Sequence, residues 1–329
     1  MARKIILDVD TGSDDAVAIM AAILSPDVQL EAVCSVAGNK DLDKTTENTL
    51  RVVQLLGADV PVYRGCREPL VKLLCPDRLA RRGDMAKKQD ENGKVIQMHD
   101  DYLQIPEAVI QEQAIRAPEF YVQYLRATTE PITLVAVGPL TNLAVALMID
   151  ETIVSKIEEI VIMGGGYNIT NVTPTAEFNI WYDPEAAQKV ITSGAKITMV
   201  PLDATHAACI TLDDCKAFRA LHTVSGDFAA ALCEQRIYMH SYGQPLAVPD
   251  AAAVHDALCI AYLIDPTVLR DVRHVHCVIG FRDFSEGQTI LDPRYYTDEK
   301  NIYYAFDGDR FKFAKILCDL FALDKKTGR

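Results

Sequence analysis

Near its N-terminus the chain reads Lys4-Ile5-Ile6-Leu7-Asp8-Val9-Asp10-Thr11-Gly12-Ser13-Asp14-Asp15-Ala16-Val17-Ala18-Ile19-Met20. The apolar, β-branched start predicts a buried strand over Lys4–Val9, and the pattern from Asp14 to Leu24 predicts a helix. Four carboxylates fall within eight residues at the junction of these two elements. Carboxylates that lie so close repel one another strongly unless something neutralises them. The stretch therefore predicts a cation at the end of a strand.

The composition is that of an ordinary globular protein. The chain has 329 residues, of which 49% are hydrophobic and 24% are charged, so a full-sized core is feasible. Its formal net charge is −13 and it contains no basic block. This balance argues against nucleic-acid binding, which needs a positive surface, and against docking on an anionic membrane.

The same sequence predicts a cytoplasmic protein. It has no apolar run of about 18 residues that would indicate a transmembrane helix. Met1-Ala2-Arg3-Lys4 leads directly into the first strand, without the apolar region of a signal peptide. The nine cysteines are scattered and form no C-x-x-C pair, which favours reduced thiols over a disulfide framework.

Strand and helix patterns alternate over residues 4–63 and again over residues 132–200. Leu42–Leu56 has the pattern of an amphipathic helix with Gly57 as its C-cap, and Ile157–Met163 has that of a buried strand. Such alternation is typical of a parallel sheet with right-handed crossovers.

We expect a single α/β domain over residues 1–329, with a mostly parallel central sheet flanked by helices in an open, doubly wound, Rossmann-like core. Residues 64–105 interrupt the alternation and contain Asn92-Gly93, a turn signal. A long segment of this kind predicts a mobile flap or an interface element. Residues 106–128 have a helical pattern, in two pieces that meet near Pro118.

Polar clusters follow the predicted strands at the points where these end. In an open α/β sheet ligands bind at the carboxyl ends of the strands, so we expect these clusters to converge, although each alone is also compatible with a solvated loop. Helix capping explains one of Asp14 and Asp15 but not Asp8 and Asp10, and all-oxygen ligation suits Ca²⁺ or Mg²⁺. The clusters are Asp8–Asp15, Gly38-Asn39, Gly164–Asn179, Pro201–His206 and His255-Asp256.

Several of these segments extend into longer motifs. They read Asp8-Val9-Asp10-Thr11-Gly12-Ser13-Asp14-Asp15, Gly138-Pro139-Leu140-Thr141-Asn142-Leu143-Ala144, Val161-Ile162-Met163-Gly164-Gly165-Gly166, Asn171-Val172-Thr173-Pro174-Thr175-Ala176-Glu177-Phe178-Asn179, Asp183-Pro184-Glu185-Ala186-Ala187 and Val254-His255-Asp256-Ala257. In sequence and in order they resemble the motifs of the inosine–uridine-preferring nucleoside hydrolases, and together they span nearly the whole chain.

The resemblance implies hydrolysis of the N-glycosidic bond of ribonucleosides to ribose and free base, through an oxocarbenium-like transition state. It implies a Ca²⁺ ion held by Asp10, Asp15, Asp256 and the backbone carbonyl of Val137, with Asp10 as general base on a metal-bound water. The residues implied at the ribose 2′- and 3′-hydroxyls are Asp14, Asn39, Asn179 and Asp256. Those implied around the 5′-hydroxymethyl group are Asn171, Glu177 and Met163.

The leaving base needs a proton or a hydrogen bond. His255 is the candidate acid because its unperturbed pKa lies near neutrality, although it could instead only order the helix that begins at Asp256. In the family the residues that contact the base come from the segment that precedes this motif. The corresponding residues here are Tyr238, His240 and Tyr242, which are also compatible with one face of an amphipathic helix.

Residues 64–105 depart from the family pattern. The family has a His-Gly-x-x-Gly-Leu-like segment that contributes to a flap over the pocket, and this chain has Met98-His99-Asp100-Asp101-Tyr102-Leu103 instead. Without the glycines we interpret the flap as different in length or mobility. We interpret His99 as a surface residue, with contact to the ligand as the alternative. The resemblance further implies a homotetramer or a homodimer.

Two other functions remain open at this point. Asp8-Val9-Asp10-Thr11 also resembles the D-x-D-x-T motif of Mg²⁺-dependent phosphatases of the haloacid-dehalogenase type, in which Asp8 would be the nucleophile. That family needs a later acidic pair, and Asp307-Gly308-Asp309 lies too near the C-terminus. The second alternative is a non-catalytic protein that binds Ca²⁺ or nucleosides.

Overall fold

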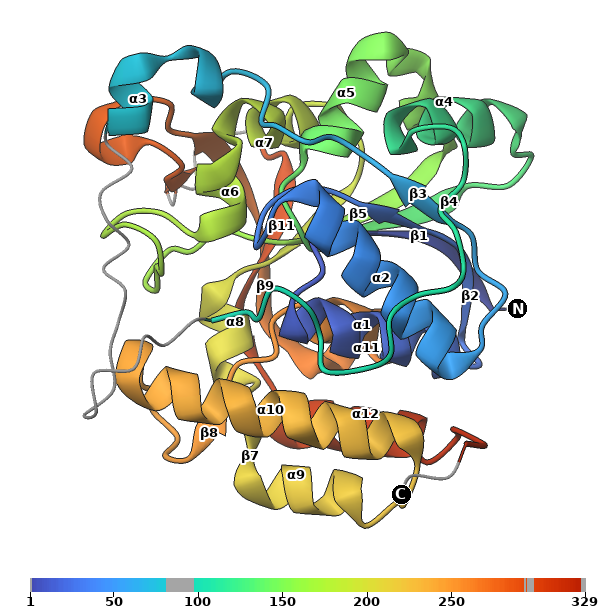
Figure 1. Cartoon of the computed structure of the whole chain (residues 1–329). Coiled ribbons are helices and arrows are strands. Elements are labelled where there is room, and N and C mark those ends of the chain that lie inside the picture. Colours follow the sequence, from blue (N-terminus) through green and yellow to red (C-terminus); the bar gives the residue numbers. More distant parts are fainter. Residues whose placement is uncertain (1, 81–97, 293, 295–298, 327–329) are drawn as a thin grey trace.

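The computed structural model describes residues 2–80, 98–292, 294 and 299–326. Within them, one nine-stranded sheet forms the centre of the molecule (Figure 1). Its strands lie in the order β10 (Thr289–Asp292), β9 (Leu269–Ile279), β11 (Ile302–Gly308), β6 (Ile197–Val200), β5 (Ile157–Met163), β4 (Ile132–Ala136), β1 (Arg3–Val9), β2 (Val28–Ser35) and β3 (Val62–Arg64).

The sheet is parallel from β11 to β3, and β9 is antiparallel to both of its neighbours. β1 lies between β2 and β4, so the strand order reverses beside it. Asp8 of β1 pairs in register with Cys34 of β2 and Ala136 of β4. This register brings the residues that follow the three strands to one edge of the sheet, at the switch point where such folds bind ligands.

Helices cover both faces of the sheet, as a doubly wound fold requires (Figure 1). Two separate apolar clusters, one on each face, form the core. On one side lie α1 (Ser13–Leu24), α2 (Leu42–Leu56), α10 (Val224–Gly243), α11 (Ala257–Ile264) and α12 (Arg310–Phe321). On the other lie α4 (Ala117–Ala127), α5 (Thr141–Ile149) and α7 (Pro184–Ile191). The predicted fold class is confirmed.

Shorter elements complete the described part of the chain. They are α3 (Pro76–Ala80), α6 (Phe178–Tyr182), α8 (Leu202–Ala207), α9 (Leu212–Arg219) and the antiparallel pair β7 (Ile210–Thr211) and β8 (Ala251–Ala252). None of the described helices is long and apolar enough to cross a bilayer.

α1 is the helix that positions the N-terminal carboxylates. Its residues from Ser13 to Ala22 are buried, which explains the apolar run in its sequence. Asp15 closes its first turn by accepting hydrogen bonds from the backbone N–H groups of Gly12, at 2.8 Å, and of Asp10, at 3.1 Å. One side chain therefore fixes both the start of the helix and the path of the chain that leaves β1.

The prediction of a helix over residues 106–128 is only half right. α4 begins at Ala117, with Pro118 in its first turn, where the missing N–H costs nothing. Before it, residues 106–116 form no helix. The backbone N–H groups of this segment instead donate hydrogen bonds to side chains of α2. Glu47 accepts from Ala108, and Gln54 accepts from Val109.

The described part of the 64–105 segment is anchored to the body of the protein. The Lys72 ammonium donates to the backbone oxygen of Trp181 at 2.8 Å and pairs with Glu286 at 3.2 Å. Arg78 binds Glu286 and Glu185. Lys72, Arg78 and Glu286 are all buried, so water screens these ion pairs little. The contacts with Trp181 and Glu185 tether the segment to α6 and α7. The predicted Asn92-Gly93 turn lies outside the described residues.

Candidate active site

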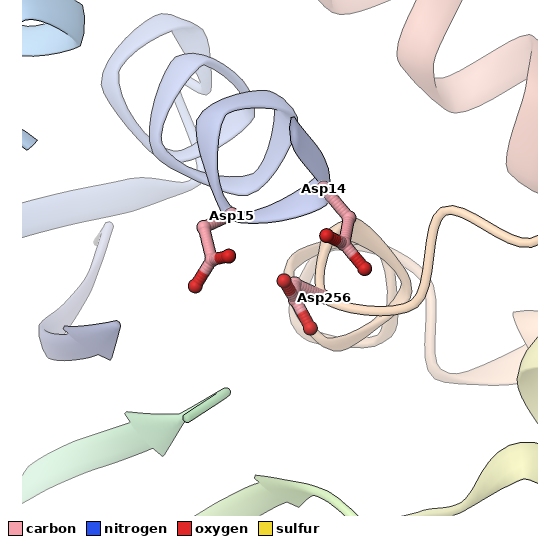
Figure 2. A group of neighbouring side chains, drawn as sticks. All are labelled: Asp14, Asp15 and Asp256. Atoms are coloured by element: carbon pink, nitrogen blue, oxygen red, sulfur yellow. The ribbon is translucent and has the colours of Figure 1, made fainter. Parts of the chain in front are cut away.

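Three buried carboxylates from opposite ends of the sequence meet at one point (Figure 2). Asp14 and Asp15 lie in the first turn of α1, and Asp256 is the residue that precedes α11. One carboxylate oxygen of each lies within 4.8 Å of the others, and all three residues are at most 4% exposed. This geometry brings together two of the predicted clusters, the first and the last along the chain.

Asp10 lies beside this group at the end of β1, and it is 1% exposed. Its Oδ2 accepts a hydrogen bond of 2.7 Å from the backbone N–H of Asn39. A Cβ atom at Gly38 would lie 2.2 Å from this oxygen, and one at Gly138 would lie 2.9 Å from Oδ1. Both positions therefore need glycine so that the backbone can approach the carboxylate.

The electrostatics of the cluster follow from its burial. Burial, and after it the neighbouring carboxylates, raise the pKa of Asp10 and of Asp256 well above the ordinary value, and the pKa of Asp15 to about 6. Four acidic side chains packed this closely favour a bound cation. Carboxylate oxygens are hard ligands, so the donor set fits Ca²⁺ or Mg²⁺ better than a thiophilic metal.

The carbonyl of Val137, the fourth ligand that the resemblance implies, follows β4 at the same edge of the sheet. Its oxygen accepts a hydrogen bond of 2.7 Å from Nδ2 of Asn179, and a carbonyl has a second lone pair for a cation. The tightest acidic group contains Asp14 rather than Asp10, which is a difference from the implied ligand set. However, Oδ1 of Asp14 already accepts a hydrogen bond of 2.9 Å from Arg236.

The implied ribose-binding residues surround the cluster. Asn39 donates from its side chain to Oδ2 of Asp15 at 3.3 Å, and Asn179 donates to the backbone oxygens of Val137 and Met163. The Sδ atom of Met163 lies 3.5 Å from the same Asn179 nitrogen. These contacts join the end of β1 to that of β2 and the end of β4 to that of β5, and the close approach of Gly138 to Asp10 joins the two pairs. The predicted convergence is therefore confirmed for the clusters Asp8–Asp15, Gly38-Asn39 and Gly164–Asn179.

Glu177 caps α6 beside this region. Its carboxylate accepts hydrogen bonds from the backbone N–H groups of Gly165, Asn179 and Ile180. These bonds favour the charged form, but burial outweighs them and raises the pKa of Glu177 to about 7. Asn171 supports the same turn, because its Oδ1 accepts from the backbone N–H of Phe178 at 2.9 Å.

Three histidines lie together on the other side of the cluster. The ring centroid of His255 is 5.7 Å from that of His206 and 6.2 Å from that of His240. Nδ1 of His255 is hydrogen-bonded to the hydroxyl of Thr205 at 2.7 Å. Burial, and then the charge of Arg236, lower the pKa of His255 well below its ordinary value. The ring is thus neutral near pH 7, and the argument from its unperturbed pKa is wrong.

The two predicted tyrosines of this region are less enclosed. Tyr238 is 47% exposed and Tyr242 is 40% exposed, and their ring centroids are 5.1 Å apart at the C-terminal end of α10. His240, between them in sequence, is 1% exposed. The His240 ring packs against those of His206 and His255.

His99 is not the surface residue that the sequence suggested. Its Nδ1 accepts a hydrogen bond of 3.2 Å from the backbone N–H of Ser13 and lies 4.0 Å from Oδ1 of Asp14. A Cβ atom at Gly12 would lie 2.1 Å from this ring nitrogen, so the glycine leaves room for the ring. The segment that lacks the family glycines still places its histidine over the start of α1.

Arg236 is the other residue that the sequence analysis missed. It lies on α10, is 1% exposed, and forms an ion pair with Asp14. The signal in the sequence was its spacing of four residues from His240, which puts both side chains on one face of the helix.

Asp8 takes no part in the acidic cluster. Its carboxylate accepts hydrogen bonds from the Tyr121 hydroxyl at 2.9 Å and from Asn142 at 3.0 Å, and burial raises its pKa to about 7. A carboxyl held in this way is a poor nucleophile, which argues against the phosphatase alternative.

The sequence model of the protein family described as Inosine-uridine preferring nucleoside hydrolase matches residues 5–315 of the chain. The chain belongs to this family. It is 38% identical to the pyrimidine-specific ribonucleoside hydrolase RihA of Enterobacter sp. (strain 638) over 98% of both chains. It is 37% identical to RihA of Shigella boydii serotype 4 (strain Sb227), over 97% of this chain and 98% of that protein.

Solved structures of nucleoside hydrolases have the same fold. The purine-preferring ribonucleoside hydrolase from Gardnerella vaginalis is similar with a TM-score of 0.84 and 28% identity, over 98% of this chain and 99% of that chain. The plant nucleoside hydrolase PpNRh1 is similar with a TM-score of 0.83 and 27% identity over the same shares. The chain is thus a member of a ribonucleoside hydrolase family over nearly its whole length.

The raised pKa of Glu177 gives a testable pH dependence. A carboxyl whose pKa rises on folding, here from 4.5 to about 7, contributes stability that is full below pH 4.5 and is lost as pH rises through 7. We expect the free energy of unfolding to fall between pH 5 and pH 8 by on the order of 2 kcal/mol more in the wild type than in Glu177→Gln.

Urea unfolding at the two pH values, at a fixed calcium concentration, measures this difference. Glu158→Gln, on the exposed side of β5, is the matched control and should behave like the wild type. An equal fall in the wild type and in Glu177→Gln would show that Glu177 is ionised throughout.

Proposed function

We propose that this protein hydrolyses the N-glycosidic bond of ribonucleosides with the help of a Ca²⁺ ion. The observation that carries the proposal is the buried group of Asp14, Asp15 and Asp256, with the buried Asp10 beside it at the end of β1. Its polar surroundings add amide groups from Asn39 and Asn179. A carboxylate-rich pocket of this kind stabilises the positive charge that develops on ribose as the bond to the base breaks.

The proposed cation is held by Asp10, Asp15, Asp256 and the carbonyl of Val137. When bound, it offsets the repulsion among the carboxylates and acidifies and orients water. Asp10 then accepts the proton of the attacking water as general base. The bond from the Asn39 N–H to Oδ2 holds the Asp10 carboxylate in one orientation for this step.

The ribose hydroxyls bind where carboxylates and amides face one another. We assign the 2′- and 3′-hydroxyls to four residues around the cluster, Asp14, Asn39, Asn179 and Asp256. We assign the 5′-hydroxymethyl group to Asn171, Glu177 and Met163, near the turn that begins α6. A ribose held at both ends presents its anomeric carbon to the water, which lowers the entropic part of the barrier.

His255 is the proposed donor to the leaving base. In this proposal the Thr205 hydroxyl donates to Nδ1, so the neutral ring keeps its proton on Nε2 and donates a hydrogen bond from it to the departing base. His240 packs beside it, and Tyr238 and Tyr242 are the proposed contacts at the open side of the base.

The names of the relatives support pyrimidine ribonucleosides as the preferred substrates, since RihA at 37–38% identity is described as pyrimidine-specific. The purine-preferring structural neighbour, at 28% identity, makes purine nucleosides the comparison to measure. A cytoplasmic location and a homodimeric or homotetrameric state stay predictions.

The general base is tested by Asp10→Asn. We expect turnover of uridine to fall at least about 100-fold, because the amide cannot accept the proton. The measurement is ribose release from uridine, cytidine, inosine, adenosine and guanosine, with and without EDTA. Asp213→Asn, a carboxylate that is 87% exposed, is the control and should match the wild type.

Near-wild-type turnover in Asp10→Asn would contradict the assignment. Phosphate release from a nucleotide without ribose release would favour the phosphatase. Nucleoside binding with no turnover in the wild type would favour a binding protein.

His255→Ala separates hydrogen bonding to the leaving base from the rest of the mechanism. We expect it to slow uridine hydrolysis much more than hydrolysis of nitrophenyl riboside, whose leaving group departs without a proton. Steady-state kinetics with both substrates measure the two losses. Equal losses would remove His255 from this role.

A further inference from the structure

Arg236 connects the two segments that carry the acidic cluster. Its Nη1 donates hydrogen bonds of 2.9 Å to the Ser13 hydroxyl and to Oδ1 of Asp14, and its Nε donates one of 2.9 Å to the backbone oxygen of Ala253. Ser13 and Asp14 begin α1, and Ala253 lies three residues before Asp256. One planar group from α10 thus fixes the start of α1 relative to the chain that leads to Asp256.

The burial of this group makes its contacts strong. Arg236 is 1% exposed and Asp14 is 4% exposed, so water screens their ion pair little. A guanidinium that makes three directed bonds cannot rotate without losing one of them, and hydrogen bonds between charged groups are about twice as strong as neutral ones. The orientation of the Asp14 carboxylate is therefore set by Arg236.

This contact resolves an ambiguity within the cluster. One carboxylate oxygen of each of Asp14, Asp15 and Asp256 lies within 4.8 Å of the others, so by distance alone all three would serve as ligands of one cation. Of the three, Asp14 is the one that forms an ion pair with a buried arginine. A guanidinium and a divalent cation compete for the same carboxylate, since each neutralises its charge.

We propose that Arg236 is a positioning residue that holds Asp14 away from the cation and reserves it for a hydroxyl of the substrate. This inference rests on the proposed function for the role of Asp14. Asp15 and Asp256 remain for the cation, together with Asp10. Without Arg236 the Asp14 carboxylate is free to turn to the cation, which gains a ligand, while the ribose loses one.

A purely structural role makes a different prediction. A buried ion pair that only stabilises the fold lowers the stability of the protein when it is broken, because a charge is left without a partner. Because Arg236 also links the segments that carry Asp15 and Asp256, its loss in a purely structural role leaves the affinity for the cation unchanged or lower, never higher. The two roles are therefore separated by binding measurements rather than by stability.

The test is Arg236→Gln in protein stripped with EDTA and titrated with Ca²⁺ by calorimetry. We expect the affinity for Ca²⁺ to rise about tenfold, because the cation gains a carboxylate ligand and a positive charge near the site is removed. We also expect the KM for uridine to rise about tenfold, with a smaller change in kcat. Unchanged Ca²⁺ affinity and unchanged KM in a folded Arg236→Gln protein would overturn the proposal.

Arg219→Gln is the matched control. It removes the same charge from an exposed ion pair between α9 and Glu234 of α10, whose side chains are 44% and 38% exposed. This variant should keep the Ca²⁺ affinity and the KM of the wild type. A change equal to that of Arg236→Gln would attribute the effect to net charge and would overturn the proposal.

Asp14→Asn tests the same claim if Arg236→Gln does not fold. Because Asp14 is not a ligand in our proposal, this variant should lose less than about tenfold in Ca²⁺ affinity while the KM rises. A loss of about 100-fold or more would make Asp14 a ligand and overturn the proposal. In the Asp14→Asn background, Arg236→Gln should no longer raise the Ca²⁺ affinity.

The calcium titrations do not depend on turnover. If the wild type hydrolyses no nucleoside but the Ca²⁺ affinities change as expected, the proposed function fails and the control of Asp14 by Arg236 stands. If the wild type hydrolyses uridine and the Ca²⁺ affinities do not change, the inference about Arg236 fails alone.

Discussion

The repulsion among buried carboxylates is the constraint on which the rest of the site depends. Asp10, Asp14, Asp15 and Asp256 are each at most 4% exposed, and burial together with mutual repulsion raises the pKa of Asp10 and of Asp256. The chain offsets part of this cost with backbone N–H groups, which Asp15 receives from Gly12 and Asp10. It offsets another part with a single guanidinium on Asp14. The remaining charge is what a divalent cation would neutralise.

The fold brings these groups together by means that have little to do with their chemistry. Parallel strands end at one edge of the sheet, so the loops that follow β1, β2, β4 and β5 meet there. The glycines at 38 and 138 let two of these loops approach the Asp10 carboxylate. α11 packs against α1 and so delivers Asp256 from far along the chain. The acidic cluster thus lowers the stability of the folded protein. Burial of the two apolar cores, one on either side of the sheet, offsets this loss.

Local patterns in the sequence predicted much of this arrangement. The helix Leu42–Leu56 with Gly57 as its C-cap and the strand Ile157–Met163 have the predicted bounds, because hydrophobic period and capping chemistry act over a few residues. The helix expected over residues 106–116 is absent, since contacts with α2 determine that segment. The same reason explains why His99 and Arg236 were missed. Their roles depend on which distant segment each one contacts, and the sequence around them does not name that segment, although the spacing of Arg236 from His240 placed both on one face of a helix.

The central claim is that the acidic cluster is built to hold one calcium ion. The most direct measurement is the melting temperature of EDTA-stripped protein at increasing Ca²⁺ concentration, for the wild type and for Asp15→Asn. A ligand that binds only the folded state stabilises it by about 2.7 kcal/mol at roughly 100 times its dissociation constant. We predict a melting temperature that rises steadily with the logarithm of the Ca²⁺ concentration in the wild type and stays constant in Asp15→Asn. A wild-type melting temperature that does not respond to Ca²⁺ would contradict the account.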